Sequence, residues 1–290
     1  MPASYNPEHG RVLSRRTDLQ RKTRCLVAYR YCRFGARRLL ERCAGCEDGC
    51  VIREFVYGRA TAALRSAYGT LDEPPVLPRD RFRGGELFEQ KWKELAEEAR
   101  RIFEVPGKVP TFGEIMPEQE PLASADGKPW RLFVAKAYGY KVPSAPLLAP
   151  ILCNLTAQCP DVLSATYSWI PAGKVIPPHR GPFRGVLRYT LGLHVPEAQS
   201  EGERVSLVID GKEHRLREGQ SILWDDTYVH SSLNTTQQPR TVLLLDVKRR
   251  PLPVLLGFLN FCVIGITYLG AYLTLRKHAQ TIANRAGKIP

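Results

Sequence analysis

The sequence predicts a mainly β domain, a double-stranded β-helix of the jelly-roll or cupin type, with flanking helices and an apolar helix at the C-terminus. Three observations support this fold class. Apolar and polar residues alternate in short segments from about residue 165, a two-residue turn joins two of these segments, and an amphipathic helical segment precedes them. Short strands joined by tight turns are typical of a small closed β-sandwich.

Residues 186–195 show the alternation most clearly. One face of this segment is apolar, whereas Arg188, Thr190 and His194 lie on the other face. The pair Asp210-Gly211 is typical of a primed hairpin turn and lies between two further alternating segments. We therefore expect additional strands over 205–209, 212–216, 221–224 and 240–247.

The chain divides into four stretches by composition. The first is a basic, cysteine-containing helical region over 1–70, and a Pro/Gly-rich linker follows over 71–85. The jelly-roll domain is expected over 86–250 and begins with an amphipathic helix over 86–103 that packs on a sheet. A hydrophobic helix and a basic tail complete the chain over 251–290.

Composition and charge exclude several classes of protein. With 43% apolar and 24% charged residues among 290, the chain is neither disordered nor fibrous. The formal net charge is +13, and residues 1–65 hold 14 Lys/Arg against 6 Asp/Glu. A basic arm of this kind suits an anionic partner, either nucleic acid or a membrane surface, and charge alone does not choose between them.

The C-terminal segment 254–275 contains 22 residues without a charge. As a helix it would be about 33 Å long, enough to cross a hydrocarbon core of about 30 Å. Tyr268, Tyr272 and the flanking Lys and Arg residues are typical of membrane interfaces. We expect membrane association, with a transmembrane helix as the first hypothesis and a buried or interfacial helix as the alternative. The flanking positive charges are nearly balanced and leave the orientation open.

The cysteines cluster in the basic arm, and their role stays open between two readings. Five of the eight lie there, in a spacing that suits either a zinc or iron–sulfur site or reduced thiols around a helix: Cys25, Cys32, Cys43, Cys46 and Cys50. Residues 1–20 lack the apolar core of a signal peptide. We therefore expect a reducing, cytoplasmic setting for the folded domain.

Two histidines and two arginines are the candidates for chemistry. His179 and His230 fall at strand edges, where a rigid scaffold can direct two imidazoles at one iron, zinc or copper ion. Arg188 and Arg240 follow them on predicted strands, and a guanidinium in a barrel suits a carboxylate ligand. The alternative is that these arginines form ion pairs within the protein, with Asp225, Asp226 or Asp246.

Three runs give these residues a recognisable setting: Ser168 to Pro182 (SWIPAGKVIPPHRGP), Leu187 to Leu193 (LRYTLGL), and Asp225 to His230 (DDTYVH) followed by Arg240. Together they resemble the aspartyl/asparaginyl β-hydroxylase family of iron(II)- and 2-oxoglutarate-dependent dioxygenases. That family includes bacterial membrane enzymes that hydroxylate lipid A acyl chains. The resemblance covers residues 126–253.

The resemblance implies Fe(II), 2-oxoglutarate and O₂ as cofactor and cosubstrates. His179 and His230 match the two iron ligands, and Ser168 and Arg240 match the residues that hold the distal carboxylate of 2-oxoglutarate. Arg188 matches a second arginine of the pocket, near a cosubstrate or substrate carboxylate, and is counted with the two histidines as catalytic.

Two further positions bear on this resemblance. Gly181 stands where most related dioxygenases outside the family place a third, carboxylate ligand, so the resemblance implies a site with two protein ligands. Thr190 departs from the histidine that the family commonly has there. We interpret His194, four residues further on, as a surface or outer-shell histidine and not as a replacement.

The resemblance predicts a hydroxylase that acts on a peptidyl Asp/Asn or a related acceptor at the membrane, with the catalytic domain in the cytoplasm. A lipid A acyl-chain hydroxylase is the second hypothesis. A third, of another class, is an inert jelly roll with a basic arm that binds nucleic acid or membrane. With the ligand set intact, we expect a membrane and a peptide or lipid acceptor as partners and no nucleic acid, and we make no prediction of oligomeric state.

Overall fold

The computed structural model describes residues 58–60, 62–63, 66, 73–105, 109–123 and 126–286. Residues 1–57, which hold most of the basic arm and all five of its cysteines, therefore lie outside the described residues, and so do the predictions for them.

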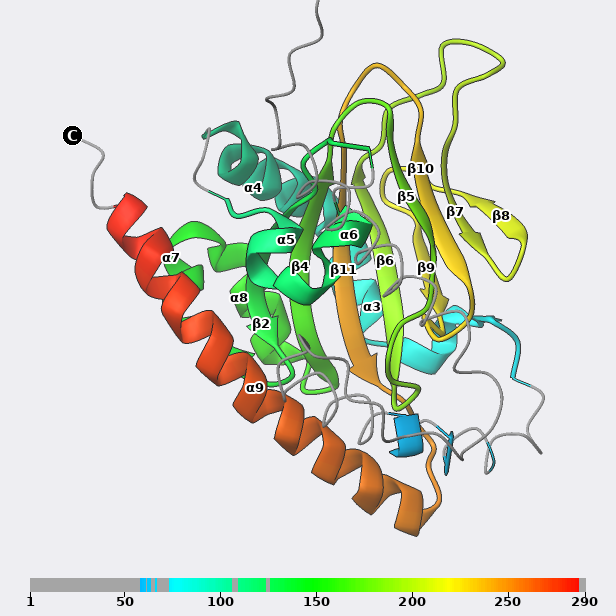
Figure 1. Cartoon of the computed structure of the whole chain (residues 1–290), viewed down its shortest axis with the longest axis vertical. Coiled ribbons are helices and arrows are strands. Elements are labelled where there is room, and N and C mark those ends of the chain that lie inside the picture. The colour runs from blue at the N-terminus through cyan, green and yellow to red at the C-terminus, as the bar shows by residue number, and fades with distance from the viewer. Residues whose placement is uncertain are drawn as a thin grey trace, which may run out of the picture. The chain divides into compact units, whose positions relative to one another are not determined.

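Antiparallel strands form two sheets, as Figure 1 shows. The large sheet has the order β1 (Val76–Leu77), β9 (Ser221–Trp224), β6 (Val186–His194), β11 (Arg240–Lys248), β4 (Val162–Ile170), β2 (Arg131–Ala137) and β3 (Tyr140–Lys141). The small sheet has the order β5 (Lys174–His179), β10 (His230–Asn234), β7 (Val205–Ile209) and β8 (Lys212–Arg215). This arrangement confirms the mainly β, jelly-roll fold class.

Helices cover one face of the large sheet. Contacts join α3 (Gly85–Gln90) and α4 (Trp92–Glu104) to β6, α7 (Ala145–Leu148) to β2, and α8 (Pro150–Gln158) to β4. The remaining helical elements are a 3₁₀ turn (Arg79–Phe82), α5 (Phe112–Ile115), a second 3₁₀ turn (Pro117–Gln119), α6 (Glu120–Ala123) and α9 (Val254–Ala286).

The strand period of two assigns neighbouring residues of the large sheet to opposite faces. Tyr167 and Tyr189 face the helices, where their hydroxyls bond Glu98 and the carbonyl of Gly85. Their neighbours Ser168 and Thr190 therefore face the small sheet. Consequently, the polar side chains of β4, β6 and β11 that carry the predicted chemistry line the space between the two sheets.

A buried carboxylate joins two of the covering helices. Glu98 of α4 accepts hydrogen bonds from the backbone N–H groups of Ile151 (2.7 Å) and Leu152 (3.1 Å) and from the hydroxyl of Tyr167 (2.7 Å). These two N–H groups belong to the first turn of α8, where helical N–H groups have no partner within the helix. Glu98 thus caps α8 from another helix and holds both helices to the sheet.

We expect Glu98→Ala to lower the free energy of unfolding by roughly 3 kcal/mol, because two buried N–H groups and a buried hydroxyl lose their acceptor. Denaturant unfolding measures this change. The neighbouring Glu97→Ala is the matched control, since Glu97 is exposed and pairs only at the surface with Arg100 and Arg101. A Glu98→Ala variant as stable as Glu97→Ala would contradict the capping role.

The hairpin prediction is confirmed in detail. Asp210 and Gly211 have positive φ angles of 49° and 80°, as a primed two-residue turn requires, and they join β7 to β8. The strands predicted over 221–224 and 240–247 correspond to β9 and β11.

Two predictions need correction. The described part of the expected linker, from residue 73, is folded onto the domain, since β1 pairs with β9 and Phe82 is buried. Within this packed segment, Pro78 precedes the 3₁₀ turn Arg79–Phe82 and Gly84 precedes α3. The single helix expected over 86–103 is two helices, because the backbone at Lys91 leaves the helical region (φ −108°, ψ 17°) between α3 and α4.

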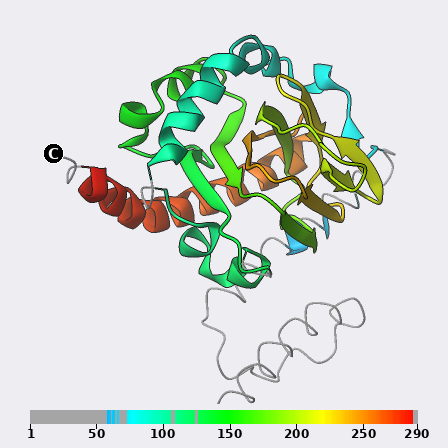
Figure 2. The same ribbon diagram turned by 90° about the horizontal axis from the view of Figure 1, so that it is seen from above.

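The apolar segment near the C-terminus forms part of the long helix α9, coloured orange to red in Figures 1 and 2. Val254–Arg276 is long and apolar enough to cross a membrane, with a mean hydropathy of 2.0. The helix also packs against the domain. Val263 is buried with Phe183 and Val186, and Tyr268 and Tyr272 contact Tyr140 edge-to-face.

Candidate functional site

The structure brings His179 and His230 together. They end β5 and begin β10, they are cross-strand partners in the small sheet, and their ring centroids are 4.0 Å apart. The Nδ1 atom of each ring lies 2.9 Å from a backbone carbonyl oxygen, that of Pro177 for His179 and that of Tyr228 for His230. When Nδ1 donates to that carbonyl, the lone pair stays on Nε2, the arrangement that metal-ligating histidines use.

Both imidazoles are neutral in this environment. Burial lowers the pKa of His179, and burial together with the neighbouring His179 lowers the pKa of His230 to about 3. A metal ion is bound by neutral imidazole. The two rings therefore hold the required protonation state at physiological pH.

A carboxyl group occupies the space left by the missing side chain of Gly181, two residues after His179. A side chain at Gly181 would meet the carboxyl group of Asp226, whose atoms lie 2.2–2.4 Å from the place of the missing Cβ. The N–H of Gly181 donates to the carbonyl of Asp226 at 2.7 Å. Gly181 thus keeps open the space that the Asp226 carboxyl group occupies, and burial raises the pKa of Asp226 to about 6.

Arg188 is engaged by two carboxylates of the protein. Its guanidinium bonds Asp246 at 2.9 Å and lies 3.2 Å from Asp226. Burial alone would lower the pKa of Arg188, but Asp246 and Asp226 outweigh it and the pKa lies above its usual value. Arg188 therefore forms the ion pairs of the alternative reading. Its contact with a cosubstrate or substrate carboxylate stays a prediction.

Arg240, unlike Arg188, has no carboxylate partner among the described residues. It is 3% exposed, and its Nη1 donates to the hydroxyl of Ser232 at 2.7 Å. Its Nε has no partner, and within the described residues no carboxylate lies within ion-pair distance. Burial lowers its pKa to about 10, so it stays charged at neutral pH. A buried cation of this kind suits an anionic ligand, because an uncompensated charge is costly.

Ser168 lies near Arg240 on the same face of the large sheet. In the register of β4 and β11, Ser168 is opposite Val242, two residues along the strand from Arg240. The Ser168 hydroxyl accepts a hydrogen bond from Trp130 Nε1 at 2.9 Å. Its own proton is therefore available to donate to a ligand. Arg240 and Ser168 together offer donors for one carboxylate.

Thr190 has a defined role in the structure. Its hydroxyl accepts a hydrogen bond from Trp224 Nε1 at 3.1 Å, and both residues are buried. The Trp224 ring in turn contacts His230 edge-on, with centroids 4.7 Å apart. Thr190 thus fixes the indole that packs against one of the two imidazoles. His194, by contrast, is exposed and lies 3.5 Å from Glu218.

We expect Thr190→Val to lower the free energy of unfolding by about 1–3 kcal/mol, because the buried indole N–H of Trp224 loses its acceptor. Thr190→Ser keeps the hydroxyl and is the matched control. Thermal or denaturant unfolding of the two variants measures the difference, and equal stability would show that this bond does not hold the indole.

The loop before His230 is held by a buried ionic cluster. Arg249 is fully buried and donates to Asp225 (2.6 Å), Glu73 (2.7 Å) and the carbonyl of Arg184 (2.7 Å). Asp225 also accepts hydrogen bonds from the backbone N–H and hydroxyl of Thr227. Asp225 thus belongs to a structural cluster and is not a partner of Arg188 or Arg240 in the described structure.

Two observations delimit the site. Within the described residues, no three His, Cys, Asp or Glu side chains form a cluster that could hold a metal, so the histidine pair is a two-ligand arrangement.

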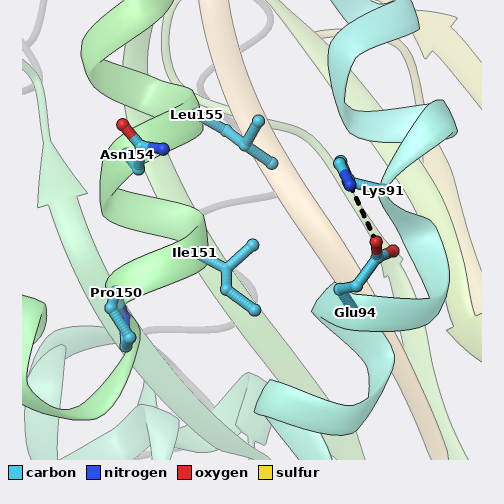
Figure 3. Close-up of a pocket in the computed structure, with 6 residues that line it drawn as sticks. All are labelled: Lys91, Glu94, Pro150, Ile151, Asn154 and Leu155. Atoms are coloured by element: carbon cyan, nitrogen blue, oxygen red, sulfur yellow. Dashed lines mark hydrogen bonds and ion pairs between the residues drawn. The ribbon is translucent and has the colours of Figure 1, made fainter.

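A separate pocket of about 510 Å³ lies between α4 and α8, on the helical side of the large sheet. Figure 3 shows Ile151 and Leu155 on one side of it and the Lys91–Glu94 ion pair on the other. None of the predicted site residues lines this pocket.

Comparison with known proteins gives the family. A family model described as aspartyl/asparaginyl beta-hydroxylase matches residues 89–250, more than half of the chain. The chain belongs to the aspartyl/asparaginyl β-hydroxylase family. Hydroxylases are thus its relatives, and the two-histidine pair lies inside the matched region.

Relatives of the β-hydroxylase family include enzymes with different acceptors. An ornithine lipid ester-linked acyl 2-hydroxylase of Rhizobium tropici is 27% identical over 211 residues, which cover 73% of each chain. The human aspartyl/asparaginyl beta-hydroxylase is 26% identical over 180 residues, covering 58% of this chain and 22% of the human protein. Among solved structures, a Pseudomonas putida prolyl-4-hydroxylase has a TM-score of 0.36 at 15% identity, covering 56% of this chain and 88% of that one.

The sequence alone does not identify the supporting residues of this candidate site. The pattern predicts Asp226 only as an ion-pair partner. It gives no sign that Trp130, Trp224 and Ser232 are the partners of Ser168, Thr190 and Arg240, respectively. Each of these contacts joins residues at least eight positions apart. The glycine at position 181 was the one available signal for Asp226, since a missing side chain leaves room for another group.

Proposed function

We propose that this chain is an iron(II)- and 2-oxoglutarate-dependent hydroxylase that acts on an acyl chain of a membrane lipid. The observation that carries the cosubstrate assignment is the buried Arg240 guanidinium without a carboxylate partner in the described structure, on the same face as Ser168. The membership of the chain in a hydroxylase family supports the reaction type.

The residues fit the proposed groups. The neutral imidazoles of His179 and His230 would hold iron, and Arg240 and Ser168 would hold the far carboxylate of 2-oxoglutarate by charge-assisted hydrogen bonds. Bound iron with 2-oxoglutarate and O₂ supplies the oxidising power to replace a C–H hydrogen by hydroxyl, with succinate and CO₂ as the other products. The protein orients these groups and excludes water between its sheets.

Arg188 would act at the other end of the same space. Along β11, Asp246 lies six residues from Arg240, and Arg188 is the cross-strand partner of Asp246. Six residues of strand span about 20 Å, so one guanidinium cannot serve both ends. We assign Arg188 to holding Asp226 and Asp246, and Arg240 to the cosubstrate.

The acceptor assignment differs from the first expectation, which was a peptidyl Asp/Asn. The relative matched over most of its length acts on an ester-linked acyl chain of a lipid, whereas the human β-hydroxylase is matched over 22% of its length. The apolar helix α9 adds a surface that suits a lipid environment. These observations favour a lipid acyl chain over a peptide.

The test is anaerobic addition of Fe(II) and 2-oxoglutarate to the purified full chain. We expect the visible metal-to-ligand charge-transfer band of an iron–2-oxoglutarate complex, and succinate release when O₂ and an acceptor are added. Lipids with ester-linked acyl chains and Asp/Asn peptides are compared as acceptors, with mass spectrometry for a gain of one oxygen. Absence of both the band and succinate in iron-replete protein would refute the proposed function, and hydroxylation of the peptide alone would refute the acceptor.

A further inference from the structure

The helix α9 carries most of the exposed apolar surface of the described structure. Of the ten large apolar side chains that are exposed in the described residues, eight belong to α9. Six of them repeat at helical spacing along one side and define the outer stripe: Leu255, Phe258, Phe261, Ile266, Leu269 and Leu273. Their exposed fractions reach 79% at Leu255 and 73% at Phe261. An apolar surface of this extent marks an interaction site.

The opposite side of α9 is occupied by the protein. Asn260 donates to the carbonyl of Gly185 at 2.9 Å, Tyr272 contacts the Tyr140 ring, and Leu275 is buried in the main core. These contacts extend from Asn260 to Leu275, which lie 15 positions apart in the sequence or about 22 Å along the helix. The domain therefore holds α9 along most of its apolar length.

This packing does not fit a helix that crosses a bilayer. If the segment 254–276 spanned the hydrocarbon core, the strands and loops that it contacts would be drawn in with it, including the short strand β3 with the exposed Lys141. Irregular backbone and charged side chains are costly in hydrocarbon. A helix that lies in the membrane plane avoids this cost. Its outer stripe reaches the lipid, whereas its inner side stays packed on the domain.

The charge next to the outer stripe distinguishes two partners that could cover it, a second copy of the chain and a lipid surface. Four Lys or Arg follow the stripe in the sequence, and no Asp or Glu does: Arg276, Lys277, Arg285 and Lys288. The three basic residues before the stripe are paired with carboxylates of the domain and are not counted. A second copy packed on the same stripe would bring two such basic segments together, whereas an anionic lipid surface is attracted to them. Arg276 begins the basic tail directly after the stripe and bonds the hydroxyl of Tyr272 at 3.0 Å.

We propose that the outer stripe of α9 docks in the plane of an anionic lipid bilayer, with the domain held against the membrane by the inner side of the same helix. This rests on the packing and the charge and deepens the proposed function, because it defines how the site meets its substrate. The segment that follows His179 connects the site to α9. Phe183, four residues after His179, is buried in the same cluster as Val263 of α9. The docked helix thereby brings the segment that follows His179 toward the lipid surface.

Vesicle flotation of the full chain tests the stripe without using activity, so its outcome is separate from that of the proposed function. The vesicles contain phosphatidylcholine alone or phosphatidylcholine with phosphatidylglycerol. We expect tighter binding to the anionic vesicles, and a loss of at least about tenfold in the double variant Phe258→Gln/Leu269→Gln. The double variant Phe258→Leu/Leu269→Ile is the matched control, since it changes the same exposed positions and keeps them apolar.

Protease digestion of the protein bound to sealed vesicles distinguishes a helix that lies in the membrane plane from a helix that spans the membrane. With a C-terminal epitope tag, docking in the plane predicts that the tag and the domain are cut from the same side of the membrane. Protection of the tag where the domain is cut would overturn the proposal in favour of a spanning helix. Equal vesicle binding by the glutamine and control variants would overturn it too, as would a dimer in solution that the glutamine variant alone disrupts.

Discussion

Replacing either His179 or His230 by alanine is expected to reduce iron-dependent turnover by more than about 100-fold, because changes even to groups that only support metal ligands cost 10–100-fold. The loss is expected to be severe because the described residues offer two imidazoles and no third ligand in a cluster. The same variants should lose the charge-transfer band on addition of Fe(II) and 2-oxoglutarate. Titration calorimetry with Fe(II) under anaerobic conditions measures the binding step by itself.

His194→Ala is the matched control for both variants. This histidine lies on β6, is exposed, and contacts only a surface glutamate in the described structure. It should retain iron binding and turnover. Full activity in His179→Ala or His230→Ala would remove that residue from the ligand set, and loss of activity in His194→Ala would show that the two-histidine assignment is incomplete.

Replacing Arg240 by methionine is expected to raise the KM for 2-oxoglutarate by about 100-fold or more, because a buried charge contributes several kcal/mol to its anionic partner. The same change should leave the stability of the protein without 2-oxoglutarate unchanged or increased. An uncompensated buried cation is costly, and a long apolar side chain removes that cost. Steady-state kinetics and thermal unfolding with and without 2-oxoglutarate measure the two effects.

Arg188→Met is the contrasting variant. It removes the partner of two largely buried carboxylates, Asp226 and Asp246, so the protein without ligands should lose stability by about 3 kcal/mol or more. The two arginines therefore have opposite expected effects on the unliganded protein. A stability loss in Arg240→Met as large as that in Arg188→Met would contradict a ligand-binding role for Arg240.

The sequence predicted the strands that carry an alternating pattern or a strong turn. Residues 186–195 and the Asp210-Gly211 turn are examples, because strand period and turn chemistry are local properties. The family resemblance placed both histidines, which the structure brings together at 4.0 Å between ring centroids. The resemblance could not show that Arg188 is paired with carboxylates in the described structure whereas Arg240 is not. The Arg188–Asp246 pair joins residues 58 positions apart in the sequence, so no local pattern reveals it.

Other features depended on packing between distant segments. Residues 73–85 have the composition of a linker, yet β1 within them pairs with β9 from residues 221–224. The apolar segment at the C-terminus predicted a membrane helix from its length, but its contacts with Tyr140 and Gly185 come from the tertiary structure. A local sequence pattern therefore predicts a strand or a helix, but only the tertiary structure shows which of its sides is exposed.

The cluster around Arg249 has a consequence for how fragments of this protein should be designed. The family match begins at residue 89, but Glu73 and β1 lie before it and supply a carboxylate to Arg249 and a strand to the margin of the large sheet. A fragment that begins at residue 89 would leave a fully buried guanidinium with one carboxylate fewer and expose the unpaired backbone of β9, a site for aggregation. Expression fragments should therefore begin upstream of Glu73.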